Sequence, residues 1–217
     1  MKRAFVSTEI PIDYFIRTNN ESQGTFLLLH GYSQTASFMW EKFEKILPST
    51  ANVIAPQGIY PLPKQFPLSS RKPNDDLFSG YGWYFFDPVT GKFPIDYRTP
   101  TLAISALLKQ LNLHETNITI IAYSQGSYLS LFCAEEIPSI SKILGINGAW
   151  RWDKLHRDLK IEIHSLNGEN DVVVDPNKAR DGHEKLLQHG CSGSFHLIKN
   201  EGHKLTPPFI DKILLLI

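Results

Sequence analysis

Short apolar runs of strand length, separated by longer stretches with helical periodicity, constrain the fold of this 217-residue chain more than any other feature. Several runs are apolar almost throughout, as in parallel sheets that are covered on both faces. The predicted strands are 14–17, 25–30, 52–56, 118–123, 142–148, 161–167 and 194–199. The predicted helices are 36–47, 100–112, 125–137, 176–189 and 206–216. This alternation predicts an α/β fold with a mostly parallel central sheet and helices on both faces.

Composition narrows the class of protein. Lys plus Arg and Asp plus Glu each number 22, so the charge gives no reason to expect nucleic acid or an anionic membrane as a partner. Cys133 and Cys191 match neither a metal-ligand spacing nor a disulfide framework. Polar residues interrupt the start of the chain where a secretion signal would be apolar, and the end is too short and charged to span a bilayer. We expect a single cytoplasmic domain over 1–217, without stable membrane insertion and with its oligomeric state open.

The segment 57–98 departs from the alternating pattern. It carries no clear periodicity, and it combines prolines and glycines with ten aromatic residues. This number of aromatic rings favours burial over disorder. We therefore expect an ordered loop over one end of the sheet near the active site. Trp83 and Tyr84 are its candidates for lining a substrate pocket, although any one of these rings could instead complete the core. Whether the loop acts as a lid is left open.

The stretch "ITIIAYSQGS" places Ser124 between a predicted strand and a predicted helix. A nucleophile held on such a strained turn needs small neighbours, because the strand and the helix approach closely there. Gly126 meets this need, and Ala122 adds only one methyl group. A serine that simply caps the helix is the alternative, but the strand before it favours a catalytic nucleophile.

A serine nucleophile requires a base and an orienting acid, which follow it in the chain in this kind of site. Asp171 lies just beyond the strand 161–167 and is the preferred acid. Glu169 and Asp175 are its rivals, with Asp175 better placed to cap the following helix. His203 follows the last predicted strand and is the preferred base.

Acyl transfer also needs N–H donors for the oxyanion of the tetrahedral intermediate. The backbone N–H of Gln125, directly after the nucleophile, is one candidate. The other is the N–H of Tyr32, because "LLLHGYSQT" ends a strand at His30 and turns at Gly31. His30 itself is then expected to be a buried, hydrogen-bonded support.

These pieces resemble the α/β-hydrolase superfamily, and within it the phospholipase/carboxylesterase family that includes acyl-protein thioesterases. The matching stretches are "LLLHGYSQT", "GYGWYFFD", "IAYSQGS", "NGENDVVVDP" and "EGHKL". The resemblance covers about 25–210 and departs from the family at Ser33, Ala122 and Ser127, where glycine is usual.

The resemblance implies an eight-stranded type of core and hydrolysis of small-molecule esters or thioesters, without a metal or organic cofactor. Ser124, His203 and Asp171 would form the catalytic triad, with Tyr32 and Gln125 as oxyanion donors. Two alternatives remain open: the same fold acting on a lactone or peptide bond, or a homologue that binds a ligand without catalysis.

Overall fold

The computed structural model describes residues 9–19, 21–22, 24–64, 77–87 and 89–217. Its main sheet has seven strands in the order β1-β3-β2-β8-β9-β10-β11. β1 is antiparallel to β3, and the other neighbours that pair in this sheet are parallel. These strands are β1 (Tyr14–Arg17), β2 (Gly24–Leu29), β3 (Asn52–Pro56), β8 (Asn117–Tyr123), β9 (Ile140–Ile146), β10 (Glu162–Gly168) and β11 (Ser192–Ile198).

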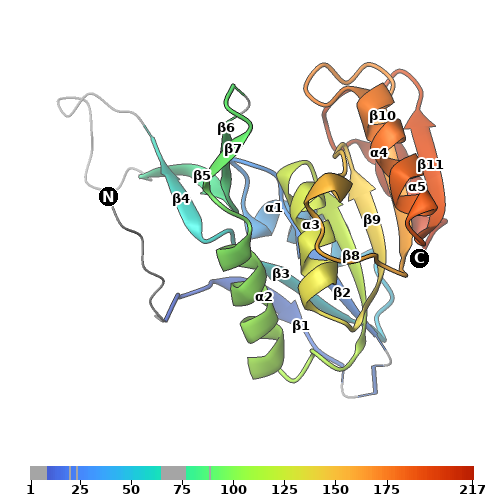
Figure 1. Cartoon of the computed structure of the whole chain (residues 1–217). Helices are drawn as coiled ribbons and strands as arrows, with labels where there is room; N and C mark the ends of the chain where they lie inside the picture. Colours follow the sequence, from blue (N-terminus) through green and yellow to red (C-terminus); the bar gives the residue numbers. More distant parts are fainter. Residues whose placement is uncertain (1–8, 20, 23, 65–76, 88) are drawn as a thin grey trace.

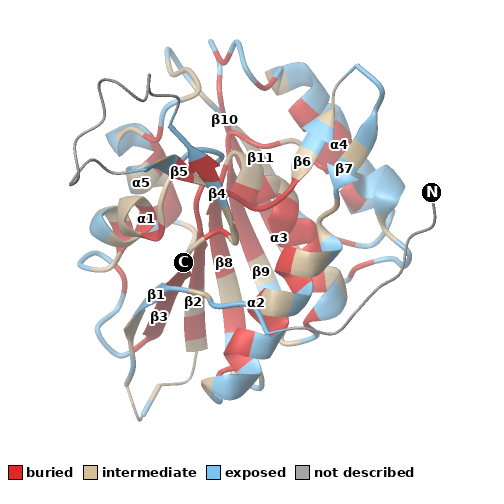
Figure 2. Cartoon of the chain, turned by 90° about the vertical axis from the view of Figure 1, so that its left-hand side faces the viewer, coloured by how far each residue is buried: buried red, intermediate tan, exposed pale blue. Residues whose placement is uncertain are grey.

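Helices cover both faces of this sheet, and buried residues lie between the layers (Figures 1 and 2). The helices are α1 (Ala36–Phe43), α2 (Arg98–Gln110), α3 (Gln125–Glu136), α4 (Pro176–Gln188) and α5 (Pro207–Leu214). Buried side chains of α2, α3 and α4 pack in one core cluster with one face of the strands. Those of α1 and α5 pack in a second cluster on the opposite face. Consecutive residues of β8 from Ile120 to Tyr123 alternate between the two clusters, which explains why this part of the strand is apolar on both faces.

The structure confirms the predicted mostly parallel sheet between two helical layers, and each predicted helix and strand has an observed counterpart. The number of strands differs from the expectation, because the main sheet formed by the described residues has seven strands and not eight. Asp175 caps α4 as predicted: its Oδ1 accepts the N–H of Asn177 at 2.9 Å, and Pro176 begins the helix.

The segment 57–98 contains structure that the sequence did not predict. It forms two small antiparallel sheets, from β4 (Tyr60–Pro63) with β5 (Phe78–Gly82) and from β6 (Phe85–Asp87) with β7 (Lys92–Ile95). Residues 65–76 and 88, which the long-loop prediction included, lie outside the described residues. These strands were not predicted from the sequence, because prolines and glycines interrupt the alternation of side chains by which a strand is recognised.

Hydrogen bonds attach β5 to the loop after β2. Ser33 N–H donates to the carbonyl of Tyr81 at 2.9 Å, and Tyr81 N–H donates to the carbonyl of Gln34 at 2.9 Å. Gly80 has φ of +148°, and a β-carbon there would lie 2.3 Å from the carbonyl oxygen of Ser33. The aromatic segment is therefore fixed beside the C-terminal end of β2, where the loop predicted to bind the oxyanion begins.

None of the helices formed by the described residues combines the length and the apolar character needed to cross a bilayer.

Candidate active site

Ser124 lies at the junction of β8 and α3 in a strained backbone conformation. Its φ of +50° and ψ of −115° fall where residues other than glycine are rare. The turn is fixed on both sides: Ser124 N–H donates to the carbonyl of Ile146 at 2.8 Å, and the Ser124 carbonyl accepts the N–H of Tyr128 at 3.2 Å. A β-carbon on Gly126 would lie 2.5 Å from the Leu29 carbonyl oxygen, so only glycine fits there. This is the geometry of a nucleophile elbow.

The structure brings the three residues predicted as the triad into one hydrogen-bonded chain. Ser124 Oγ lies 2.9 Å from His203 Nε2, and His203 Nδ1 lies 2.8 Å from Asp171 Oδ2. The Asp171 carboxylate is an acceptor only, so Nδ1 carries the proton and Nε2 is free to accept the serine proton. The side chain of Asp171 has no exposed surface, and that of His203 is 20% exposed.

Asp171 is held in place by its own loop. Its second oxygen, Oδ1, accepts the N–H groups of Val173 at 2.8 Å and Val174 at 2.9 Å. The rival acid Glu169 instead accepts the N–H of Asn200 through Oε2 at 3.1 Å. The structure thus distinguishes the three acidic candidates. Asp171 contacts the imidazole of His203, Glu169 bonds to the backbone of Asn200, and Asp175 caps α4.

The two predicted oxyanion donors are available for hydrogen bonding. Neither the N–H of Tyr32 nor that of Gln125 has an acceptor among the described residues. Gln125 is also the first residue of α3, so the positive end of the helix dipole lies at Ser124. Ser33, which follows Tyr32, has φ of +60°, which explains why glycine would be suited to this position.

His30 is a buried, hydrogen-bonded support of the loop that follows β2, as predicted. It is fully buried, and its Nδ1–H donates to the Gly31 carbonyl at 2.7 Å. Its Nε2 accepts the N–H of Gly58 at 2.9 Å and lies 3.0 Å from Nε2 of Gln57. Burial lowers the pKa of His30 from 6.5 to about 4, so the imidazole stays neutral and keeps this bonding pattern.

The side chain of Gln125 is a site feature that the sequence analysis missed. Its Oε1 accepts the N–H of Trp83 at 2.9 Å, and its Nε2 donates to the carbonyl of Tyr84 at 2.8 Å. Trp83 in turn donates its indole N–H to the carbonyl of His30 at 2.8 Å. The Gln125 side chain therefore fixes Trp83 and Tyr84 against the loop that follows β2.

Trp83 and Tyr84 are more deeply buried than residues that line an open pocket. Trp83 has no exposed surface, and Tyr84 is 6% exposed. Both form part of the core cluster beside α2 and α3. They pack within this core, and their role in lining a substrate pocket stays a prediction.

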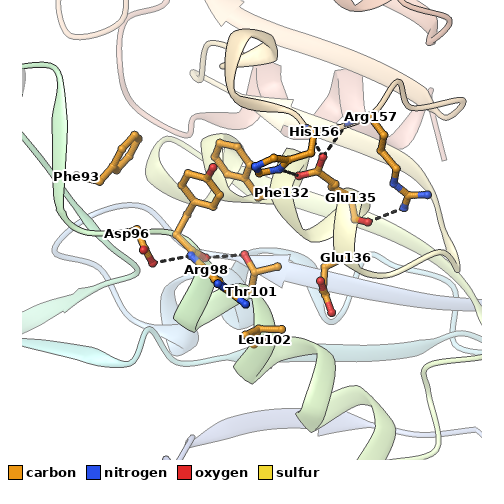
Figure 3. A pocket seen from close by; sticks show the side chains of 11 residues that line it. Phe93, Asp96, Arg98, Thr101, Leu102, Phe132, Glu135, Glu136, His156 and Arg157 are labelled. Carbon is orange, nitrogen blue, oxygen red and sulfur yellow. Dashed lines mark hydrogen bonds and ion pairs between the residues drawn. The ribbon is translucent and has the colours of Figure 1, made fainter. Parts of the chain in front are cut away.

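A cavity of about 740 Å³ lies away from Ser124, between the start of α2, the end of α3 and the segment 156–157 (Figure 3). None of the predicted triad or oxyanion residues lines it. Its polar groups bond to one another: Glu135 Oε1 accepts the N–H of His156 at 2.5 Å and that of Arg157 at 3.2 Å. A large pocket is the usual first candidate for a site, but none of the features predicted for catalysis lies in this one.

A second acid–imidazole–hydroxyl chain occurs on β10 and β11. Glu162 Oε1 lies 2.8 Å from His164 Nε2, and His164 Nδ1 lies 2.7 Å from Ser194 Oγ. Ser194 lies inside a regular strand, so it lacks the sharp turn and the helix N-terminus that are found at Ser124. Hydrogen bonding alone does not identify a nucleophile, and the elbow distinguishes the two serines.

No arrangement of three or more His, Cys, Asp or Glu side chains suited to a metal ion occurs in the part of the chain that the structure describes.

A family model described as serine hydrolase (FSH1) matches residues 20–207. The chain belongs to this family. The protein is therefore a hydrolase, and the α/β-hydrolase resemblance seen in the sequence is confirmed. The curated proteins include no significant match.

Solved structures of esterases share the fold at low sequence identity. Esterase PE8 has a TM-score of 0.75 and 18% identity, over 95% of this chain and 98% of that chain. A carboxylesterase from Mesorhizobium loti has a TM-score of 0.73 and 19% identity, over 97% and 96%. Acyl-protein thioesterase 2 from Zea mays has a TM-score of 0.69 and 16% identity, over 94% and 96%.

The close approach at the elbow gives a test of stability. Replacing Gly126 with Ala would place a methyl group 2.5 Å and 2.6 Å from the carbonyl oxygens of Leu29 and His30. We expect the free energy of unfolding, measured by urea denaturation, to fall by roughly 1–3 kcal/mol. Gly91→Ala is the control, because nothing lies within 4 Å and only its φ of +66° penalises alanine, by about 1 kcal/mol. A Gly126→Ala protein as stable as the parent would contradict the close approach.

The lowered pKa of His30 gives a test by pH. Between pH 6.5 and about 4, the unfolded chain takes up a proton that buried His30 does not, so stability must fall as pH falls through this window. From pH 6.5 to 5 this residue should account for about 2 kcal/mol of lost unfolding free energy. In His30→Gln the decline over that range should be smaller by this amount in urea unfolding. An equal fall of the unfolding free energy with pH in the two proteins would show that folded His30 takes up a proton as readily as the unfolded chain does.

Proposed function

We propose that this protein, acting as one catalytic domain, cleaves carboxylic esters or thioesters through an acyl-enzyme on Ser124. The hydrogen-bonded chain from Ser124 Oγ through His203 to the buried carboxylate of Asp171 carries the proposal. Ser124 is a strained serine at a helix N-terminus with a base at 2.9 Å, and the N–H groups of Tyr32 and Gln125 have no acceptor among the described residues. These features are suited to acyl transfer. The names of the similar structures, esterase, carboxylesterase and acyl-protein thioesterase, support a carboxylic acyl substrate.

The first half of the reaction acylates the enzyme. Ser124 Oγ attacks the substrate carbonyl carbon while His203 Nε2 takes the hydroxyl proton. The N–H groups of Tyr32 and Gln125 donate to the oxyanion that forms. His203 then gives its proton to the leaving alcohol or thiol as the bond between the carbonyl carbon and the leaving group breaks.

The second half releases the acid. Water attacks the acyl carbon, His203 Nε2 takes its proton, and the bond to Ser124 Oγ breaks with return of the proton to the serine. Asp171 keeps the proton of the neutral imidazole on Nδ1 and stabilises the imidazolium that forms in both halves. All groups that move protons in this cycle belong to the chain, so the proposal requires no metal or organic cofactor.

Substitution of the triad tests this mechanism. With a nitrophenyl ester as substrate, we expect Ser124→Ala and His203→Ala each to lower kcat by roughly 10⁴-fold or more. Asp171→Asn should lower kcat by about 10⁴-fold, because the imidazole then adopts the wrong tautomer. Asp175→Asn is the matched control, because this carboxylate caps α4 and should leave kcat unchanged. An Asp171→Asn enzyme that retains the parent kcat would remove the acid from the mechanism.

Covalent labelling and a substrate panel separate the alternatives. A fluorophosphonate probe should label the parent protein and fail to label Ser124→Ala. Labelling that survives this substitution would place the reactive serine elsewhere. Turnover should be found among nitrophenyl esters and acyl thioesters, whereas selective turnover of lactones or peptide amides would change the bond assigned. Tight binding without turnover would indicate a non-catalytic homologue.

A further inference from the structure

The base of the proposed triad lies on a loop, and a loop must be fixed if its imidazole is to bridge two partners. His203 lies between β11 and α5, outside any helix or strand. One backbone hydrogen bond joins this loop to the acid loop, from Asn170 N–H to the Glu201 carbonyl at 2.7 Å. Beyond it, the carbonyls of Gly202 and His203 accept hydrogen bonds from two side chains at the ends of neighbouring strands.

Tyr123, the last residue of β8, is one of these two. Its hydroxyl donates to the backbone carbonyl of His203. Its ring lies beside the imidazole of His203, with ring centroids 5.6 Å apart. The ring also packs against the loop that follows β2, because a β-carbon on Gly31 would lie 2.9 Å from Tyr123 Cδ1. Tyr123 therefore contacts the loops that carry His203 and Tyr32, and it directly precedes Ser124 in the chain.

Tyr123 stays a hydrogen-bond donor across the pH range in which esterases are assayed. The residue is 6% exposed, and burial raises the pKa of its hydroxyl from 10.0 to about 12. The donated bond to the His203 carbonyl is therefore kept at neutral pH.

Asn147, the first residue after β9, is the second side chain. It is fully buried, and its Nδ2 donates to the Gly202 carbonyl at 3.1 Å, while its Oδ1 accepts the N–H of Gly168 at 2.9 Å. Gly168 ends β10, just before the acid loop, so one amide joins the loops of the base and the acid. The φ of Asn147 is +48°, a conformation that asparagine tolerates better than most residues.

We propose that Tyr123 and Asn147 are positioning residues, which hold consecutive carbonyls of the histidine loop so that the imidazole of His203 bridges Ser124 and Asp171. Neither side chain needs to contact the substrate. Their effect is on geometry, because a catalytic group displaced by about 1 Å can cost roughly 100-fold in rate. This inference rests on the proposed function of the triad.

Two substitutions remove the donors. Tyr123→Phe keeps the ring and its packing. Asn147→Gly keeps the positive φ without strain, and it also removes the acceptor of the Gly168 N–H and a buried side chain. In each variant we expect kcat for a nitrophenyl ester to fall roughly 10- to 100-fold with KM within about two-fold, since neither side chain contacts the substrate in this proposal. Rates are normalised to active sites titrated with the fluorophosphonate probe. Tyr97→Phe, which loses a hydroxyl beside the separate cavity, should retain the parent kcat.

The hydrogen bond between His203 Nδ1 and Asp171 gives a readout that folding defects alone would not move. A proton held between an imidazole and a buried carboxylate gives a separate, strongly downfield NMR signal that exchanges slowly with water. We expect this signal of His203 in the free protein to broaden or move upfield in Tyr123→Phe and Asn147→Gly. This readout requires no substrate, so it decides the inference even if the panel of esters is not turned over.

Failure of the inference differs from failure of the proposed function. An active parent whose kcat and His203 Nδ1–H signal are both unchanged by Tyr123→Phe and Asn147→Gly would overturn the positioning role. So would a loss of rate that disappears on normalisation to titrated active sites. An inactive parent would instead contradict the proposed function, and the Nδ1–H signal would still test the placement of His203.

Discussion

The left-handed backbone of Ser124 is the constraint on which the rest of the site depends. At φ of +50° the chain leaves β8 and enters α3 within one residue, which raises the hydroxyl above the sheet edge. The turn is stable only because its neighbours leave room: Gly126 faces the carbonyls of Leu29 and His30, and the Ser124 N–H is bonded to β9. The strain is held by the packed sheet, which is how such outliers persist at functional sites.

The other parts of the site are arranged around this elbow by parallel strands that end at the same edge. The loop after β2 brings the Tyr32 N–H, the loop after β10 brings Asp171, and the loop after β11 brings His203. Side chains join these loops to one another, as Gln125 joins α3 to the aromatic segment. The site is thus a set of loops joined by hydrogen bonds, on a core that fixes where each loop begins.

The sequence predicted the elements well because their signals are local. Buried strands such as β8 are mostly apolar, and Asp175 with Pro176 marks the start of α4. The triad was predicted from residue type, chain order and position at strand ends. The contacts of Asn147 and of the Gln125 side chain were not, because they depend on which strand ends are neighbours in the sheet. One usable signal was present: Asn147 is a polar residue that directly follows the apolar run 143–146. The strands β4 to β7 were missed because their pairing partners, not their own pattern, stabilise them.

Ser124 is proposed to carry the acyl group during turnover, and isolation of that acyl-enzyme gives the sharpest evidence for or against this role. The enzyme would be mixed with an excess of a nitrophenyl ester, quenched in acid within the first turnovers, and digested for peptide mass spectrometry. We expect the mass of the acyl group on the peptide that contains Ser124, formed at the rate of the burst of nitrophenol. Steady turnover with the acyl group on another residue, such as Ser194, would contradict this role.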